Sequence, residues 1–383
     1  MSPSLRFPEF NGEWKNTTLE ECVDFLDGQR KPIKSDDRKG EKRLYPYYGA
    51  SGIIDYIDEY IFDGDYILLS EDGANIIDRN YRVAFIANGK IWVNNHAHVL
   101  QPHKEMNINF LSEALERINY AIYNTGTTMP KLNQEICRKI NLNVPSLSEQ
   151  NKIGNLLYLL NERIATQNRL IDRLQSLMIG LNNSLYEQYG NDITTSFMEL
   201  GYSYSGLSGK SAKDFGSGKP FITYLNVYSN IIVDETDYQY VRINDGEKQN
   251  IVRTGDVLFT LSSETPEEVG IGSVYLGEKE VYLNSFCFGI HIERNQLAYS
   301  PYLSYYVTST AFRKFIYPFA QGSTRFNLCK ADFEKASIKL PSLDNQKRIS
   351  AMLDCIAEKI QAEKAILEYY NIQRQYLLRQ MFI

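Results

Sequence analysis

The sequence contains one heptad helix twice, and this repeat restricts the possible folds more than any other feature. From Ile153, apolar residues recur in alternating steps of four and three, as in the seam of a coiled coil. Each position returns 196 residues later, and both copies have one polar residue in the seam. The seam residues are Ile153, Leu157, Leu160, Ile164, Gln167 and Ile171 in the first copy, and Ile349, Leu353, Ile356, Ile360, Glu363 and Leu367 in the second. Each copy predicts roughly 38 helical residues, about 57 Å long.

The two helices are predicted to pair with each other in antiparallel orientation. If the second block between them is compact, the chain leaves that block close to where it entered, and the second helix runs back along the first. This pairing would place Gln167 opposite Glu363, where a hydrogen bond could fix the register; the alternative is a solvated gap in an imperfect coil. The segment Ser146-Leu147-Ser148-Glu149 has the spacing of a capping box and predicts the start of the first helix.

The repeat also divides the chain of 383 residues, which exceeds the usual size of a single core. The helix lead-ins match at the same offset, including Gly126 with Gly322 and Gln150 with Gln346. We predict globular blocks at 1–125 and 190–321, each followed by a joint and long helix, at 126–189 and 322–383. The expected fold class is α+β, with two pseudo-repeated α/β domains separated by a pair of long antiparallel coiled-coil helices.

Short strands and turns are predicted inside both blocks. In the first, Asp63-Gly64 and Asn88-Gly89 favour turns, the latter in a hairpin. In the second, residues 220–225 predict a strand. Residues 255–259 resemble 64–68, and residues 281–284 resemble 91–94, at offsets of 190 to 191. The two blocks are therefore interpreted as diverged copies of one fold with separately varied loops.

Positive charge gathers in one loop of each block, although the net charge of the chain is −6. Lysine and arginine beside tyrosine, asparagine and histidine can bind phosphates and base edges. Each loop taken alone is more often a solvated surface, as is expected of the acidic stretch at 55–65, but two such loops at matching places in repeated blocks favour binding. The candidate nucleic-acid contacts are Arg30, Lys31, Lys34, Arg38, Lys39, Arg43, Tyr47, Tyr48, Asn94, Asn95 and His96 in the first block, and Lys210, Lys213, Lys219 and Tyr224 in the second.

Evidence for catalysis or metal binding is weak in this sequence. The motif of amino-methyltransferases is missing because the chain has no Pro-Pro, and Gly209-Lys210-Ser211 lacks the first glycine of a P-loop. His96, His98 and His103 form the nearest approach to a metal constellation, but ordinary polar packing explains them better. Five scattered cysteines indicate neither disulfides nor a zinc site. Without an apolar run of membrane-spanning length or a signal core, a soluble, cytoplasmic protein is expected.

With these motifs assembled, the whole chain resembles the specificity subunit of type I restriction-modification systems. The resemblance rests on residues 45–52, 63–75 and 92–98 in the first block and on 206–210 and 215–227 in the second. The joints Gly126-Thr127-Thr128 and Gly322-Ser323-Thr324, each followed by Pro-Ser-Leu, match as well.

The resemblance implies a non-catalytic DNA reader with two target recognition domains. Each domain would read one half of a bipartite double-stranded target, and the helices would set the spacer and dock the methyltransferase subunits, two of them expected. S-adenosylmethionine, ATP and magnesium are expected on partner subunits, including a restriction and translocase subunit, and no cofactor is expected in this chain. No membrane partner is expected.

Two other function classes stay open at the level of sequence. A coiled-coil scaffold with two protein-binding β-rich domains would carry the same heptads, with its basic loops merely solvated. A self-contained nuclease or methyltransferase would need a site that the sequence hides.

Overall fold

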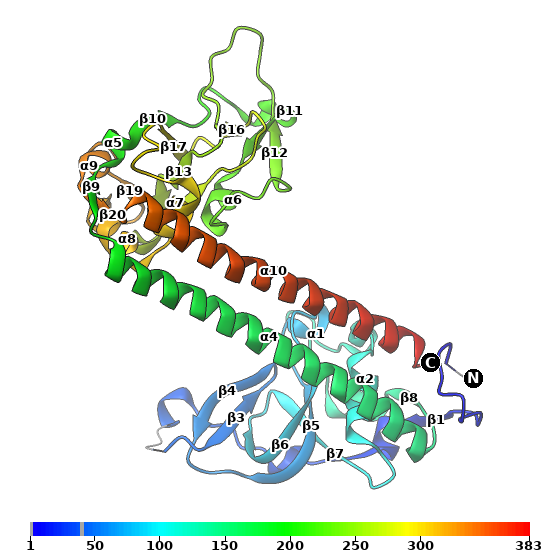
Figure 1. Ribbon diagram of the computed structural model, residues 1–383. Helices are drawn as coiled ribbons and strands as arrows, with labels where there is room; N and C mark the ends of the chain where they lie inside the picture. Colours follow the sequence, from blue (N-terminus) through cyan, green and yellow to red (C-terminus); the bar gives the residue numbers. More distant parts are fainter. Residues whose placement is uncertain (1–2, 39–41) are drawn as a thin grey trace. The chain divides into compact units, whose positions relative to one another are not determined.

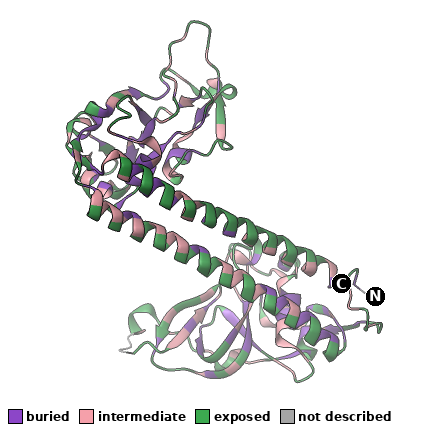
Figure 2. Ribbon diagram, in the orientation of Figure 1, coloured by how far each residue is buried: buried purple, intermediate pink, exposed green. Residues whose placement is uncertain are grey.

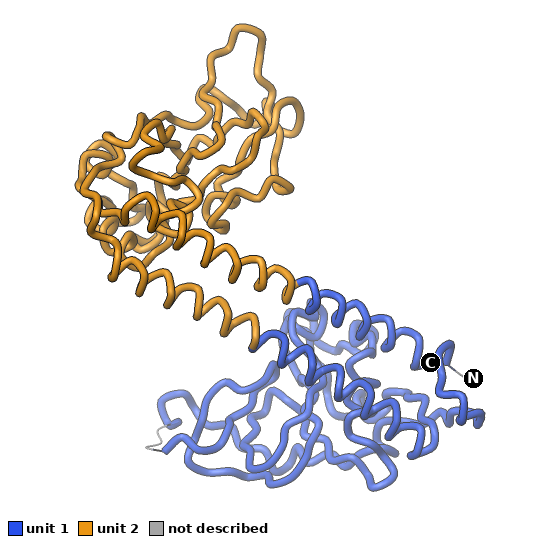
Figure 3. Tube along the Cα trace, in the orientation of Figure 1, with its two compact units in different colours: residues 1–169, 365–383 blue, residues 170–364 orange. Residues whose placement is uncertain are grey.

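The computed structural model describes residues 3–38 and 42–383, and it divides the chain into two compact units. Unit 1 comprises residues 1–169 and 365–383, and unit 2 comprises residues 170–364 (Figure 3). Each unit therefore combines one globular block with a part of both long helices. Within the described ranges, no helix is long and apolar enough to cross a membrane.

The two predicted long helices are present as α4, Leu147–Tyr189, and α10, Leu343–Gln380 (Figure 1). Unit 1 holds the first part of α4 together with the last part of α10, and unit 2 holds the remaining parts. In unit 1, Arg163 on α4 donates to the hydroxyl of Tyr370 on α10 over 3.1 Å. The helices therefore run antiparallel, which confirms the predicted fold class.

The seam residues lie on the covered side of both helices, where buried positions recur between exposed turns (Figure 2). The buried ones are Ile153, Leu157, Leu160, Ile171, Ile349, Leu353, Ile360 and Glu363. The half-buried ones are Ile164, Gln167, Ile356 and Leu367. Glu363 forms an ion pair with Lys359, one turn away, at 2.5 Å. The pairing of Gln167 with Glu363 stays a prediction, because these two residues belong to different units.

The predicted capping box does not form at the start of α4. The carboxylate of Glu149 instead accepts two hydrogen bonds from Arg6, each at 2.7 Å, and one from the indole of Trp14 at 3.3 Å. A buried acid finds stronger partners in a guanidinium than in its own helix terminus. Glu149 therefore ties the N-terminal segment of the chain to α4.

A six-stranded sheet forms the centre of unit 1, in the order β2-β7-β5-β6-β3-β4 (Figure 1). Its strands are β2 Val23–Phe25, β3 Tyr45–Gly49, β4 Gly52–Ile57, β5 Phe62–Ser70, β6 Ala84–Val93 and β7 Ala97–Pro102. The short helices are α1 Asn75–Asp78, α2 Ile108–Glu116 and α3 Gln134–Arg138. The main core of the unit includes Trp14, Phe110 on α2, Leu157 on α4 and Phe382 after α10, so both long helices help to close it.

The turns predicted at Asp63-Gly64 and Asn88-Gly89 are wrong. Strands β5 and β6 pair without interruption from Phe62 with Ile91 to Leu69 with Ala84. Gly64 lies opposite Gly89, and both have positive φ, +151° and +74°. Because only glycine adopts such angles readily, the two glycines allow β5 and β6 to stay paired where the sequence suggested turns.

Unit 2 divides its strands among smaller sheets, of which the largest has the order β10-β17-β13-β15. Two three-stranded sheets have the orders β12-β11-β16 and β14-β19-β18. Their strands are β10 Gly201–Ser205, β11 Phe215–Ile222, β12 Tyr238–Val241, β13 Val257–Thr260, β14 Ser262–Ser263, β15 Gly272–Val274, β16 Tyr282–Leu283, β17 Cys287–Ile292, β18 Ala320–Gln321 and β19 Phe326–Leu328. The helices are α5 Phe197–Leu200, α6 Tyr224–Ser229, α7 Ser300–Tyr306, α8 Thr310–Ile316 and α9 Lys330–Lys335. A buried aromatic cluster includes Phe197, Phe259, Phe312 and Phe333.

The strand predicted at residues 220–225 is only partly correct. Strand β11 ends at Ile222, and the hydroxyl of Thr223 caps α6 by accepting from the amide of Asn226 at 3.1 Å. Tyr224 therefore lies in the first turn of a helix. A threonine between an apolar run and a helix is a typical N-cap.

Both units attach their long helix in the same way. A two-stranded ribbon precedes each helix: β1 Lys15–Thr18 pairs with β8 Asn141–Val144, and β9 Ile193–Thr195 pairs with β20 Ile338–Leu340. One helical turn later, the buried amide of Gln150 donates to the carbonyl of Pro145 at 3.0 Å, and that of Gln346 donates to Pro341 at 2.9 Å. The glutamine contacts and the second strand of each ribbon recur at the 196-residue offset, so the sequence repeat is a structural repeat.

Candidate nucleic-acid interface

An exposed turn follows a parallel strand pair in unit 1. Strands β3 and β6 run parallel, with Tyr48 opposite Val93. The amide of Asn94 donates to the carbonyl of Tyr48 at 3.1 Å, and the Asn94 side chain accepts from the amide of His96 at 2.8 Å. Because Asn94 is 5% exposed, its side chain supports the turn, while Asn95 and His96 lie in solvent. Nδ1 of His96 lies 2.9 Å from the carboxylate of Asp72, which accepts the hydrogen bond.

Unit 2 repeats this turn with different side chains. Strands β11 and β16 run parallel, with Ile222 opposite Leu283. The amide of Asn284 donates to the carbonyl of Ile222 at 3.0 Å, and the Asn284 side chain accepts from the amide of Phe286 at 2.9 Å. Phe286, which is 56% exposed, therefore occupies the place of His96. Sequence reasoning missed Phe286, although the resemblance of 281–284 to 91–94 at an offset of 190 could have located it.

The first basic loop lies against the same strand pair. The indole of Trp92 on β6 donates to the carbonyl of Lys31 at 2.6 Å, and the amide of Ile33 donates to the hydroxyl of Tyr47 on β3 at 2.9 Å. Lys31 and Lys34 are exposed on this anchored loop. Lys31 therefore lies beside the end of β6, and the turn at Asn94 begins directly after that strand.

Several residues of this block that were predicted to contact nucleic acid make contacts within the protein. Arg30 is mostly buried and binds the carboxylate of Glu71 and the carbonyl of Ala97, each at 2.7 Å. Tyr47 is 1% exposed, and Tyr48 is half-buried. The guanidinium of Arg38 lies 4.7 Å from the ring centre of Tyr47. That these residues contact nucleic acid stays a prediction. Their packing shows that they support the loop. Lys39 lies outside the described residues.

The acidic stretch is not simply a solvated surface, which corrects the expectation for Asp55. Its carboxylate lies 3.9 Å from the guanidinium of Arg38 and 3.6 Å from that of Arg43. Asp58 accepts hydrogen bonds from the amides of Lys42 and Arg43, at 3.1 and 2.6 Å. Strand β4 and the segment after it therefore neutralise part of the basic loop and hold its end.

In unit 2, the side chain of Lys210 also binds groups within the protein. Its ammonium donates to the carbonyl of Arg242 and to Glu247, both at 2.6 Å, and its side chain is 5% exposed. The hydrogen bond from Lys210 lowers the pKa of Glu247 to about 2. Lys213 and Lys219 are exposed, and the hydroxyl of Tyr224 donates to the carbonyl of Ser262 at 2.8 Å. The predicted residues that present their side chains to solvent are Lys31, Lys34, Arg43, Asn95, His96, Lys213 and Lys219.

A buried ion pair lies beneath the interface of unit 1. Nδ1 of His98 is 2.6 Å from Asp27, and Nε2 is 2.8 Å from the carbonyl of Leu132. Burial by itself would lower the pKa of His98, but the hydrogen bonds to Asp27 and Cys137 and the negative charge of Asp27 outweigh it and raise that pKa to about 10. His98 is therefore an imidazolium that donates from both ring nitrogens and links the joint at Leu132 to strand β7.

We expect this pair to make the stability of unit 1 depend on pH. The folded pKa of His98 exceeds its unfolded value, so the stabilisation is complete below about pH 6.5 and is lost as pH rises toward 10, by a few kcal/mol at most. The measurement is urea unfolding at pH 6.5 and pH 9, followed by tryptophan fluorescence, because both tryptophans, Trp14 and Trp92, lie in unit 1. In the variant His98→Gln the difference between the two pH values should shrink; an unchanged difference would contradict the assignment.

The histidines named as a metal constellation do not converge. His98 is buried, His96 contacts Asp72, and Nε2 of His103 lies 3.4 Å from Asp24. Among residues 3–38 and 42–383, no three histidine, cysteine or acidic side chains come together as metal ligands could.

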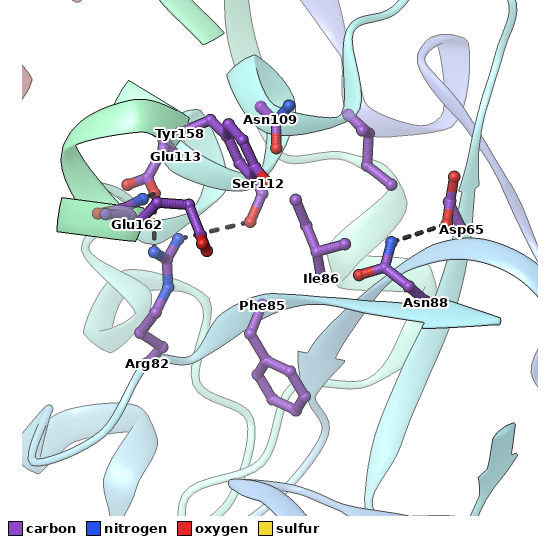
Figure 4. A pocket seen from close by; sticks show the side chains of 12 residues that line it. Asp65, Arg82, Phe85, Ile86, Asn88, Asn109, Ser112, Glu113, Tyr158 and Glu162 are labelled. Carbon is purple, nitrogen blue, oxygen red and sulfur yellow. Dashed lines mark hydrogen bonds and ion pairs between the residues drawn. The ribbon is translucent and has the colours of Figure 1, made fainter. Parts of the chain in front are cut away.

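A cavity of about 590 Å³ in unit 1 is lined by β6, α2 and α4, and its polar side chains bind one another (Figure 4). Arg82 donates to Glu113 at 2.7 Å, and Asn88 donates to Asp65 at 2.7 Å. Asn161 on α4 also donates to Glu113, at 2.8 Å, and Arg374 on α10 donates to it at 2.6 Å. The buried carboxylate of Glu113 thus accepts hydrogen bonds from the segment before β6, from α4 and from α10. This arrangement is suited to holding helices together rather than to binding a substrate.

Comparisons with known proteins agree with the repeat found in the two units. A family described as "Type I restriction modification DNA specificity domain" matches the chain twice, over residues 11–176 and 207–369. The chain is 27% identical over 364 residues to the putative type I restriction enzyme specificity subunit S.HindORF215P of Haemophilus influenzae, covering 89% of this chain and 86% of that protein. It is 25% identical over 378 residues to the putative type I specificity subunit S.MpnORF507P of Mycoplasma pneumoniae, covering 91% and 94%.

Similarity to a solved structure extends over the whole fold. The crystal structure of the type I restriction-modification system S subunit from M. genitalium matches with a TM-score of 0.62 and 16% identity. The match covers 100% of this chain and 99% of that one.

Proposed function

The chain belongs to the type I restriction-modification DNA specificity family, and from this premise we propose that each of its two units reads one half of a bipartite double-stranded DNA target. The observation that carries the proposal is the repeated turn after a parallel strand pair. Asn94 and Asn284 make the same hydrogen bonds, but the exposed residues that follow differ. One scaffold with two different exposed surfaces is what two independent half-sites require.

Exposed cations supply the contacts to phosphate in this proposal. Lys31 and Lys34 in unit 1 and Lys213 and Lys219 in unit 2 are exposed beside the repeated strands or on the loop before them. Phosphate contacts fix the position of a protein on the duplex, whereas side chains at the turns meet base edges. Since the net charge of the chain is −6, its own binding to DNA should be weak and sensitive to salt.

The long helices set the distance between the two half-sites in this proposal. A helix of 38 residues, such as α10, is about 57 Å long, which equals at most about 17 base pairs. Domains set back from the ends of such a rod could contact positions roughly one turn of duplex apart.

Partner subunits carry out the chemistry in this proposal, and this chain is not itself an enzyme. Two modification subunits that use S-adenosylmethionine dock on the long helices, and a restriction and translocase subunit uses ATP and magnesium. In unit 1, α10 has an exposed apolar stripe at three- and four-residue spacing: Ile366, Tyr369, Ile372 and Tyr376. An uncovered stripe on a helix that already buries its opposite face is suited to a second helical partner.

The experiment that tests the proposed function is a domain exchange in the assembled complex. The chain is co-expressed with a type I modification subunit, and methylated adenines are mapped by single-molecule sequencing. Replacing residues 1–125 by the corresponding block of a relative should change one half of the motif and leave the other half and the spacer unaltered. The matched exchange of residues 190–321 should change only the other half.

Two results would contradict this proposal. A soluble complex that methylates no recurring motif would favour the scaffold alternative. A motif whose two halves both change after a single exchange would show that the units do not read independently.

A further inference from the structure

The turn of each unit is completed by a second loop that the sequence analysis did not connect with it. In unit 1, Asp72 forms an isolated antiparallel bridge with Lys131, in the joint before α4. In unit 2, Ser262 on β14 pairs with Asn327 on β19, in the joint before α10. The offsets of 190 and 196 are those of the sequence repeat, so Asp72 and Ser262 occupy equivalent positions.

Asp72 and Ser262 each bind one exposed polar side chain, and this side chain comes from a different loop in each unit. Asp72 binds the imidazole of His96, whose side chain is 50% exposed. Ser262 instead accepts a hydrogen bond from the guanidinium of Arg325 at 3.3 Å. Arg325 lies in the joint loop and takes the place of Met129 in unit 1, which is 60% exposed.

Arg325 is further oriented by the aromatic residue at the turn. Its guanidinium carbon lies 5.8 Å from the ring centre of Phe286, within the range of a cation–π contact. Tyr224 contributes to the same cluster, because its hydroxyl donates to the carbonyl of Ser262. Arg325 is exposed, so the cluster presents a planar donor group held by two contacts.

We infer that Arg325, held by Ser262 and Phe286, reads a guanine in the half-site of unit 2, and that His96, held by Asp72, reads a base at the equivalent position in the half-site of unit 1. This inference rests on the proposed function. A guanidinium presents two parallel donors that match O6 and N7 of guanine in the major groove. Arginine can also bind a phosphate through two donors, and the two roles differ in their effect: loss of a phosphate contact lowers the rate on every duplex, whereas loss of a base contact lowers one preference.

The test measures base preference in the complex with its modification subunit. Methylation rates are determined for duplexes that carry each of the four base pairs at every position of both half-sites. For Arg325→Ala, we expect preference at one G·C position of a single half-site to fall by roughly tenfold to hundredfold, with the other half-site unaltered. Arg325→Lys should retain binding but keep less of this preference, and His96→Ala should relax one position in the other half-site.

Matched controls separate reading from folding. Lys335→Ala removes another exposed cation of unit 2, on α9, and should leave every preference as in the parent chain. A uniform fall of the rate over all duplexes in Arg325→Ala, or an unchanged motif, would overturn the inference. Failure of the proposed function is distinguishable, because the parent complex itself would then show no bipartite motif.

Discussion

Inserting seven residues into both long helices should lengthen the spacer of the recognised motif by about three base pairs and leave both half-sites unchanged. Seven residues add about 10.5 Å of helix, and one base-pair step is 3.4 Å. One heptad also preserves the apolar seam, which an insertion of another length would rotate away from its partner. The insertions belong after Arg169 in α4 and after Lys364 in α10, where they interrupt neither compact unit.

The spacer is measured by mapping methylated adenines for the parent and the lengthened chain in the same complex. The matched control is an insertion in α4 alone, which leaves the two helices unequal and should abolish or strongly reduce methylation. An unchanged spacer in an active, doubly lengthened complex would show that the helices do not set the distance between half-sites.

Replacing Glu113 by alanine should destabilise unit 1 by about 3 kcal/mol, since removing one partner from a buried ion pair leaves the others uncompensated. Its carboxylate is 3% exposed and accepts from Arg82, Asn161 and Arg374. The substitution removes the acceptor that joins α2 to both long helices. Urea unfolding followed by tryptophan fluorescence reports on this unit, which holds both tryptophans.

A control for this prediction lies in the same cavity. Glu162 on α4 is exposed and lines the cavity, so Glu162→Ala removes the same charge without disturbing the cluster and should change the free energy of unfolding by less than about 0.5 kcal/mol. A double-mutant cycle between Glu113→Ala and Arg374→Ala should give a coupling above about 1 kcal/mol. Equal effects of Glu113→Ala and Glu162→Ala would exclude a special role for Glu113.

The elements with a strong period were predictable from the sequence. The heptads require an apolar partner, and the repeat supplies it within the chain, so α4, α10 and their antiparallel direction follow. Turn signals were less reliable: Gly64 and Gly89 occur in the middle of a long hairpin, because two glycines opposite each other can lie within paired strands as well as end them.

The candidate interface was predictable in outline only. The sequence identified His96, but its equivalent Phe286 differs in chemistry and carries no charge, so only the weak repeat at an offset of 190 could have located it. Arg325 was missed for another reason: it is 39 residues beyond Phe286 in the chain. The pairing of β14 with β19, together with the hydrogen bond from the amide of Leu261 to the carbonyl of Phe286, brings the two together.

The repeat, the two long helices and the family follow from the sequence alone, because periodicity and ordered motifs are properties of the chain. Which charged residues are exposed for binding depends instead on how the chain folds. Arg30 and Lys210 looked like Lys31 and Lys213 in the sequence, but half-buried carboxylates and backbone carbonyls bind the first two. The partners of a charged side chain come from distant segments, and the free energy of desolvation depends on those partners rather than on neighbours in sequence.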